Sequence, residues 1–291
     1  MLCHCYFVNA VQNEGICDLI WDSSGLKMRV GVLGGGLQGC CVALSLAERG
    51  VDVCLLDRNT RLLSRAAVAN EGKVHLGYMY ANDGGHSTAR MTMRGALAFA
   101  PYFERHLGLS KGAITVSRPA TYAVHRDSQR APAEVSHYLS TVHAMIREAS
   151  EANRGAYFGH DFSEPLRVWS DAERETHFDP GIAVAAFDTP EIAIDPVALA
   201  DLVRERVRTE PRIEVRLEHE VLSVRDDEGL TVTASASGSI VRERFDHVVN
   251  ALWDGLRSTR RSGCGRCVRG CTVSNTGSAS GYRRVSARRR V

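Results

Sequence analysis

The sequence predicts an α/β fold built around a parallel sheet. Residues 28–33 form a short apolar run, residues 37–49 place apolar side chains at helical spacing, and residues 51–56 form a second apolar run. This order is typical of a βαβ unit, because parallel strands are buried on both faces and a helix must join them. Gly50 stands where the helix would need a C-terminal cap.

Further elements are expected along the rest of the chain. Residues 64–86 are rich in Gly, Asn, Ser and His, and are expected to form a structured loop. Helices are predicted at 87–109, 133–152 and 195–208, the last entered through Pro196. Strands are predicted at 120–125, 182–187, 213–218, 220–224, 230–234 and 245–251.

The turn between the first predicted strand and its helix carries Gly34, Gly36 and Gly39 in GxGxxG spacing. The spacing alone is a weak signal, but here a strand precedes it and a helix follows it, as a Rossmann-like nucleotide-binding domain requires. Gly34 permits the tight turn, Gly36 lets a pyrophosphate approach the backbone, and Gly39 lets the helix lie close to the sheet. Leu37 and Gln38 begin the helix, whose free N–H groups favour phosphate.

A carboxylate closes the second strand of this unit. Asp57 lies 23 residues after Gly34, and Arg58 follows it. A carboxylate there accepts hydrogen bonds from ribose hydroxyls and disfavours a 2′-phosphate, and therefore NADP. A glycine-rich turn without a ligand is the alternative interpretation, and the motif itself does not distinguish FAD from NAD.

The segment from Ser64 to Gly77 (SRAAVANEGKVHLG) follows in place of a further βα repeat. It resembles the corresponding segment of the D-amino-acid-oxidase-like FAD-dependent oxidoreductases. The resemblance implies FAD, with Ser64, Asn70 and Gly72 beside its pyrophosphate and isoalloxazine ring. His75 is the catalytic candidate, as a base or as a group that tunes the flavin; a hydrogen-bonded loop histidine is the alternative. Lys73, Tyr78, Tyr80 and His86 are weaker candidates for the substrate side.

Softer similarities continue to about residue 255. The Ile194-Asp195-Pro196 segment is similar to the family's return from its substrate domain. The resemblance places the backbone of Val221 beside adenine, and Ala251 at the end of a strand beside the cofactor. It therefore implies a Rossmann-like FAD-binding domain at 28–110 and 191–255, with a mixed α+β substrate domain inserted at 111–190.

The resemblance implies oxidation of a CH–NH or CH–OH bond of a small amino- or hydroxy-acid-like substrate, by hydride transfer to the flavin. A catalytically inactive fragment that retains only nucleotide binding is one alternative, and an NAD-dependent dehydrogenase is another. The electron acceptor, the exact substrate and the oligomeric state are left open by the sequence.

The two ends of the chain differ from its centre. Residues 1–27 are expected to be an irregular extension. Residues 256–291 are expected to be a disordered tail, because from 257 onward they contain ten arginines, no acidic residue and no Ile, Leu, Met, Phe or Trp. A frameshifted or truncated reading of a longer gene is the explanation that we expect for this composition.

Composition narrows the function classes. Without the tail the chain has 26 basic and 34 acidic residues, which offers no general basic face for nucleic acid. The nine cysteines are grouped without enough further ligands for a metal, so no metal site is expected and Cys40 and Cys41 are expected to be core thiols. With no transmembrane run and no basic signal region, a cytoplasmic location is expected.

Overall fold

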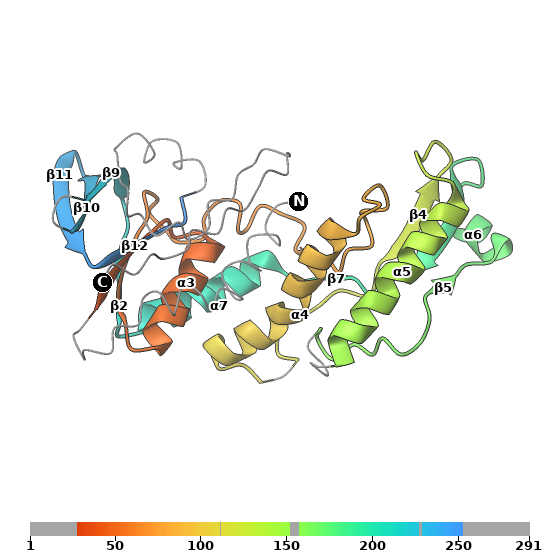
Figure 1. Ribbon diagram of the computed structural model, residues 1–291, viewed down its shortest axis with the longest axis horizontal. Coiled ribbons are helices and arrows are strands. Elements are labelled where there is room, and N and C mark those ends of the chain that lie inside the picture. Colours follow the sequence, from red (N-terminus) through yellow and green to blue (C-terminus); the bar gives the residue numbers. More distant parts are fainter. Residues whose placement is uncertain (1–27, 111, 152–156, 227–228, 253–291) are drawn as a thin grey trace, which may run out of the picture.

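A four-stranded parallel sheet lies towards one end of the computed structural model (Figure 1), which describes residues 28–110, 112–151, 157–226 and 229–252. Its strands are β1 (Arg29–Leu33), β2 (Asp52–Leu56), β8 (Ile213–Arg216) and β12 (His247–Asn250). They stand in the order β12-β1-β2-β8, and every neighbouring pair is parallel. The predicted α/β fold with a Rossmann-like parallel sheet is confirmed.

The sheet lies between a layer of helices and a second, antiparallel sheet. Helices α3 (Leu37–Glu48) and α7 (Pro196–Thr209) cover one face (Figure 1). The other face carries the meander β9 (His219–Asp226), β10 (Leu230–Ala236) and β11 (Ser239–Phe245). The alternation of β2 explains both contacts: Val53 and Leu55 belong to the core cluster of the helices, whereas Cys54 and Leu56 join that of the meander.

The other end of the molecule holds a smaller antiparallel sheet. Its strands β4 (Thr121–His125), β6 (Ala183–Asp188) and β5 (Arg167–Val168) stand in the order β4-β6-β5. Helices α5 (Pro132–Glu151) and α6 (Asp171–His177) lie beside it, and α4 (Ser87–Leu107) lies between the two ends of the molecule (Figure 1). The short pair β3 (Lys73–Val74) and β7 (Ile192–Ala193) also connects distant parts of the chain. The predicted domain boundaries stay a prediction.

Most predicted elements match the structure within two residues, and one differs. The strand expected at 245–251 is divided, because Phe245 ends β11 and the chain turns at Asp246 before β12 begins. This turn is fixed by two hydrogen bonds between Asp246 and Arg29: the Asp246 amide donates to the Arg29 carbonyl oxygen at 3.0 Å, and the Arg29 amide donates to Oδ2 of Asp246 at 2.7 Å. The expectations for 1–27 and for the arginine-rich tail lie outside the described residues. Within the described ranges, no helix is long and apolar enough to cross a membrane.

Candidate cofactor site

The predicted glycine turn lies at the carboxyl ends of three parallel strands. Gly34 follows β1, Asp57 follows β2 and Ala251 follows β12. Strands β2 and β12 flank β1 on opposite sides, so the chain changes direction across the sheet at this point. Open parallel sheets bind their ligands in the crevice at such a switch point.

The three glycines of the motif have different surroundings. Gly34 has a φ of +104°, and a Cβ there would lie 2.7 Å from the carbonyl oxygen of Ala251. A Cβ on Gly39 would lie only 1.8 Å from the carbonyl oxygen of Gly34. Gly36 differs, because it is exposed and a Cβ there would meet none of the described residues within 4 Å, apart from its chain neighbours. The turn is therefore tightly packed beneath Gly36 and open above it.

Helix α3 begins directly beneath this open position. Its N-cap is Gly36, which has no side chain to accept a hydrogen bond, and its first turn contains no acidic residue. Leu37 and Gln38 are partly exposed there. An N-terminus without an acidic partner keeps its partial positive charge available to an anion.

Asp57 holds the turn as well as facing the site. Its Oδ2 accepts the amide of Gly35 at 2.6 Å, while its Oδ1 accepts both the backbone and side-chain nitrogens of Asn59 at 2.8 and 2.7 Å. An ionised carboxylate offers about four acceptor positions, so one more donor, such as a ribose hydroxyl, can still be bound. The sequence motif did not predict the bond to Gly35.

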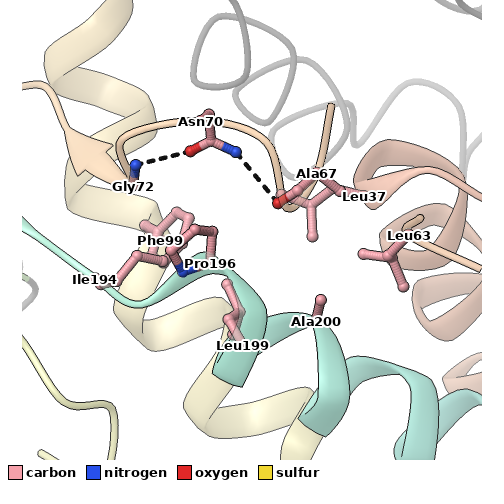
Figure 2. Close-up of a pocket in the computed structure, with 10 residues that line it drawn as sticks. All are labelled: Leu37, Leu63, Ala67, Asn70, Gly72, Phe99, Ile194, Pro196, Leu199 and Ala200. Carbon is pink, nitrogen blue, oxygen red and sulfur yellow. Dashed lines mark hydrogen bonds between the residues drawn. The ribbon is translucent and has the colours of Figure 1, made fainter. Parts of the chain in front are cut away.

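Part of the Ser64–Gly77 segment, which resembles that of the FAD-dependent oxidoreductases, lies beside the start of α3. Leu37, Asn70 and Gly72 line one small, mostly apolar pocket together with residues of α4 and α7 (Figure 2). Asn70 shapes this loop, because its Oδ1 accepts the amide of Gly72 at 2.8 Å and its Nδ2 donates to the carbonyl oxygen of Ala66 at 2.9 Å. Gly72 has a φ of +67°, and a Cβ there would lie 2.1 Å from the carbonyl oxygen of Ile194.

The remaining predicted cofactor residues are spread around the same edge. Ser64 and Arg58 are exposed. Val221 is buried in the meander core, and β9 begins beside Asp57, since the amide of His219 donates to the carbonyl oxygen of Asp57 at 2.9 Å. The structure thus brings together the glycine turn, Asp57 and Ala251, and separately Leu37, Asn70 and Gly72. Their contacts with a cofactor stay a prediction.

His75 lies in a buried polar cluster that its local sequence did not reveal. Its Nδ1 is 3.3 Å from Oε2 of Glu191, and the hydroxyl of Tyr122 donates to the same carboxylate. Burial, and then the neighbouring Glu191 charge, raise the pKa of Tyr122, which keeps its hydroxyl protonated. The available signal for Glu191 was its position directly before the apolar residues Ile192–Ile194.

The weaker candidates near His75 have structural partners. The Tyr78 hydroxyl lies 2.7 Å from Nδ1 of His143, and His86 stacks on Tyr138 with ring centroids 5.2 Å apart. Lys73 is exposed, and Tyr80 is half-buried with its ring edge-on to His75. Cys40 and Cys41 are buried free thiols, as expected.

The donors and acceptors at the sheet edge suit a dinucleotide. The amides at the start of α3 face the space above Gly36 and suit a diphosphate, while Asp57 suits the hydroxyls of a ribose. Filling the open position with a side chain would occupy this space. The residues present therefore fit a cofactor such as FAD.

Comparison with solved structures supports the fold. Glycine oxidase from Geobacillus kaustophilus superposes with a TM-score of 0.54 at 17% identity, over 77% of this chain and 55% of that one. Iminodiacetate oxidase from Chelativorans sp. BNC1 gives a TM-score of 0.54 at 21% identity, over 76% of this chain and 54% of that one. The chain spans about half the length of these two proteins.

Sequence comparison identifies the family. A stretch of 75 residues, 25% of this chain, is 36% identical to the FAD-dependent monooxygenase FPY4 of Fusarium mangiferae and covers 20% of that protein. The pattern of the family described as FAD dependent oxidoreductase (DAO) matches residues 29–263, which include both halves of the parallel sheet. The chain therefore belongs to the FAD-dependent oxidoreductase family, and the cofactor of that family is FAD.

Proposed function

We propose that this chain binds FAD at the glycine turn and contributes to the oxidation of a CH–NH or CH–OH bond in a small amino- or hydroxy-acid-like substrate. The observation that carries the proposal is the open space at Gly36 above a tightly packed turn, at the switch point of the sheet. The family membership supports FAD over NAD. The glycine and iminodiacetate oxidases of similar fold support an amino-acid-like substrate.

Each part of the site has a proposed role. The first amides of α3, at Leu37, Gln38 and Gly39, bind the diphosphate, and Asp57 accepts from the ribose. Arg58 and Ser64 lie along the cofactor, the backbone of Val221 meets adenine, and Ala251 closes the turn from β12. When bound, FAD would supply the two-electron oxidation of the substrate carbon.

The flavin end of the site is proposed at the loop that leads to β3. Asn70 holds Gly72 in its positive-φ conformation, which places the backbone of this loop beside the pocket of Figure 2. His75 follows three residues later and is the proposed proton acceptor for the substrate N–H or O–H group. The substrate identity and electron acceptor are not part of the proposal, and the cytoplasmic location stays a prediction.

Equilibrium dialysis of the 291-residue chain against FAD, NAD and NADP tests cofactor binding, with the flavin absorbance spectrum as readout for FAD and the ultraviolet absorbance of adenine as readout for NAD and NADP. We expect retention of FAD alone. Gly36→Val should fold normally, because its Cβ meets no neighbour within 4 Å, but should lose FAD, because the side chain occupies the phosphate path. Gly85→Val is a matched control, since Gly85 is exposed in a loop with only its neighbour Asp83 nearby.

Two results would contradict this proposal. Retention of NAD without FAD would assign the turn to a nicotinamide cofactor, and wild-type FAD affinity in Gly36→Val would remove the turn from the binding site. Retention of FAD without turnover of any amino or hydroxy acid would favour nucleotide binding alone as the function of this chain.

A further inference from the structure

A buried carboxylate fills a ring of backbone amides just after β3. Glu191 is 1% exposed, and its Oε1 accepts the amides of Leu76, Gly77 and Tyr78 at 2.7, 3.1 and 3.4 Å. Successive amides converge on one atom only where the chain curls, and Gly77 provides the curl with a φ of +116°. Such a backbone arrangement is an anion site, and here the chain supplies the anion itself.

The second carboxylate oxygen makes the contacts that bear on chemistry. Oε2 of Glu191 is 3.3 Å from Nδ1 of His75 and accepts the hydroxyl of Tyr122. Burial raises the pKa of Glu191, but hydrogen bonds from His75, Tyr122 and the Leu76 amide outweigh it and hold the pKa below the usual value. Glu191 is therefore ionised and can only accept hydrogen bonds.

An acceptor-only carboxylate decides which nitrogen of His75 carries the proton. Because Nδ1 faces Glu191, Nδ1 must be the donor, and the neutral imidazole has its proton there. The other ring nitrogen, Nε2, then has the basic lone pair. A proton taken up at Nε2 creates an imidazolium whose charge lies against the Glu191 carboxylate.

A second buried histidine in the same region has the opposite arrangement. Nε2 of His143 is 2.8 Å from the carbonyl oxygen of Glu164, which can only accept, so Nε2 is the donor in neutral His143. Its Nδ1 accepts the hydroxyl of Tyr78 at 2.7 Å. The structure therefore contains one histidine of each neutral form: His75 with its proton on Nδ1 and His143 with its proton on Nε2.

We propose that Glu191 is a positioning residue that fixes His75 in the Nδ1–H form and so makes Nε2 the proton acceptor of the oxidation. The role in oxidation rests on the proposed function, whereas the protonation pattern does not. Oxidation of a CH–NH or CH–OH group sends one hydrogen from carbon with both electrons to the cofactor. The other hydrogen leaves nitrogen or oxygen as a proton, which Nε2 of His75 accepts.

The test is a long-range ¹H–¹⁵N correlation spectrum of the 291-residue chain, labelled with ¹⁵N-histidine and free of cofactor. His75→Gln assigns the ring signals by removing them. We expect a protonated Nδ1 and an unprotonated Nε2 at His75, with the reverse at His143. In Glu191→Gln the amide nitrogen can donate to Nδ1, so the ratio of the two forms at His75 should shift by about tenfold or more towards Nε2–H.

Matched variants separate positioning from folding. Tyr122→Phe removes a neighbour of Glu191 but keeps the carboxylate, so His75 should keep its Nδ1–H form. The His143 signals should be unchanged in both variants, which reports an intact fold. A wild-type His75 in the Nε2–H form, or an unchanged ratio in folded Glu191→Gln, would overturn the proposal.

The protonation pattern of His75 can be measured whether or not the chain binds the cofactor. The wild-type spectrum decides the protonation pattern even if Glu191→Gln does not fold. If the chain fails to retain FAD in dialysis, the proposed function fails while the His75 measurement still stands. If FAD is retained and His75 is in the Nε2–H form, the proposed function stands and the role of Glu191 fails.

Discussion

Two backbone curls in this chain present amide groups to an anion, but only one of them is left open. At the glycine turn, Gly34 has a φ of +104°, and a Cβ on Gly36 would meet no non-neighbouring atom of the described residues within 4 Å. After β3, Gly77 has a φ of +116° and Glu191 occupies the amides that follow His75. We propose that the same local chemistry binds a ligand where the chain leaves the site open, whereas it holds the fold together where the chain provides its own carboxylate.

The filled curl should be the more costly of the two to disturb. Glu191→Ala leaves three buried amides and the Tyr122 hydroxyl without their acceptor. Removing one partner of a buried charged group costs about 3–5 kcal/mol, so we expect a loss of that size in the free energy of unfolding. Urea denaturation followed by circular dichroism measures it.

Glu205 provides the control for that measurement. It is an exposed helix residue paired with Arg208, so Glu205→Ala should leave the denaturation midpoint almost unchanged. Equal losses in the two glutamate variants would show that the burial of Glu191 contributes no special stability.

Substitutions on the packed side and on the open side of the glycine turn should have different effects. Gly39→Ala brings a Cβ within 1.8 Å of the Gly34 carbonyl oxygen, so we expect about 3 kcal/mol of destabilisation together with loss of FAD binding. Gly36→Ala should keep the wild-type stability, because its Cβ has free space, and should weaken only the binding of FAD. Thermal unfolding and flavin fluorescence titration distinguish the two; a Gly39→Ala protein of wild-type stability would disprove the close packing of the turn.

Asp57 should have a smaller effect on FAD binding than the glycine turn itself, because it offers a single acceptor for the ribose. Asp57→Ala removes a ribose acceptor, and we expect FAD binding to weaken by about 1–3 kcal/mol, the range for a hydrogen bond to a charged group. Asp52 begins the same strand and pairs with Arg212 on the surface, so Asp52→Ala should leave FAD affinity unchanged. Unfolding must be measured in parallel, since Asp57 also accepts the Gly35 amide.

The sequence predicted the open curl well because its determinants are local. Strand β1, helix α3 and strand β2 lie within one residue of the predicted ranges, and the apolar runs and glycine positions specify them. The two faces of β2 are both buried, which is why an unbroken apolar run was the correct signal. The segment that follows Asp57 predicted FAD, and the family match over residues 29–263 confirmed it.

Elements without a buried face were missed. Helix α6 has no buried residue, so it shows no apolar period; only its Ser170 cap, which accepts the amide of Glu173 at 3.3 Å, marks its start. Strand β11 has only Phe245 buried and carries charged residues along its length. Pairing with β10, rather than its own pattern, makes it a strand.

The filled curl was beyond sequence reasoning for a different reason. His75 and Glu191 are 116 residues apart, and nothing near either residue indicates the other. Tyr122 contacts the Glu191 carboxylate from β4, which belongs to the separate antiparallel sheet β4-β6-β5. His75 was identified as a candidate from the neighbouring glycine segment, but its carboxylate partner depends on how β3 and β7 pair.

The smallest expected effect is a change in how stability depends on pH, and it tests the charge of Glu191 rather than its size. The pKa of Glu191 is below its ordinary value of 4.5 in the folded chain, so its ionised form stabilises the fold at all pH values above that range. This contribution is lost as the pH falls through the folded pKa.

We therefore expect the stability difference between wild type and Glu191→Gln to be constant near neutral pH and to shrink in acid. It should be smaller than the effect of Glu191→Ala, because protonation keeps the side chain in place. His75 and Tyr122 face the carboxylate, and repeating the comparison in a His75→Gln background removes the contribution of the imidazole and isolates Glu191. A difference that does not change with pH would show that Glu191 is already protonated at neutral pH, and that His75 has no anionic partner.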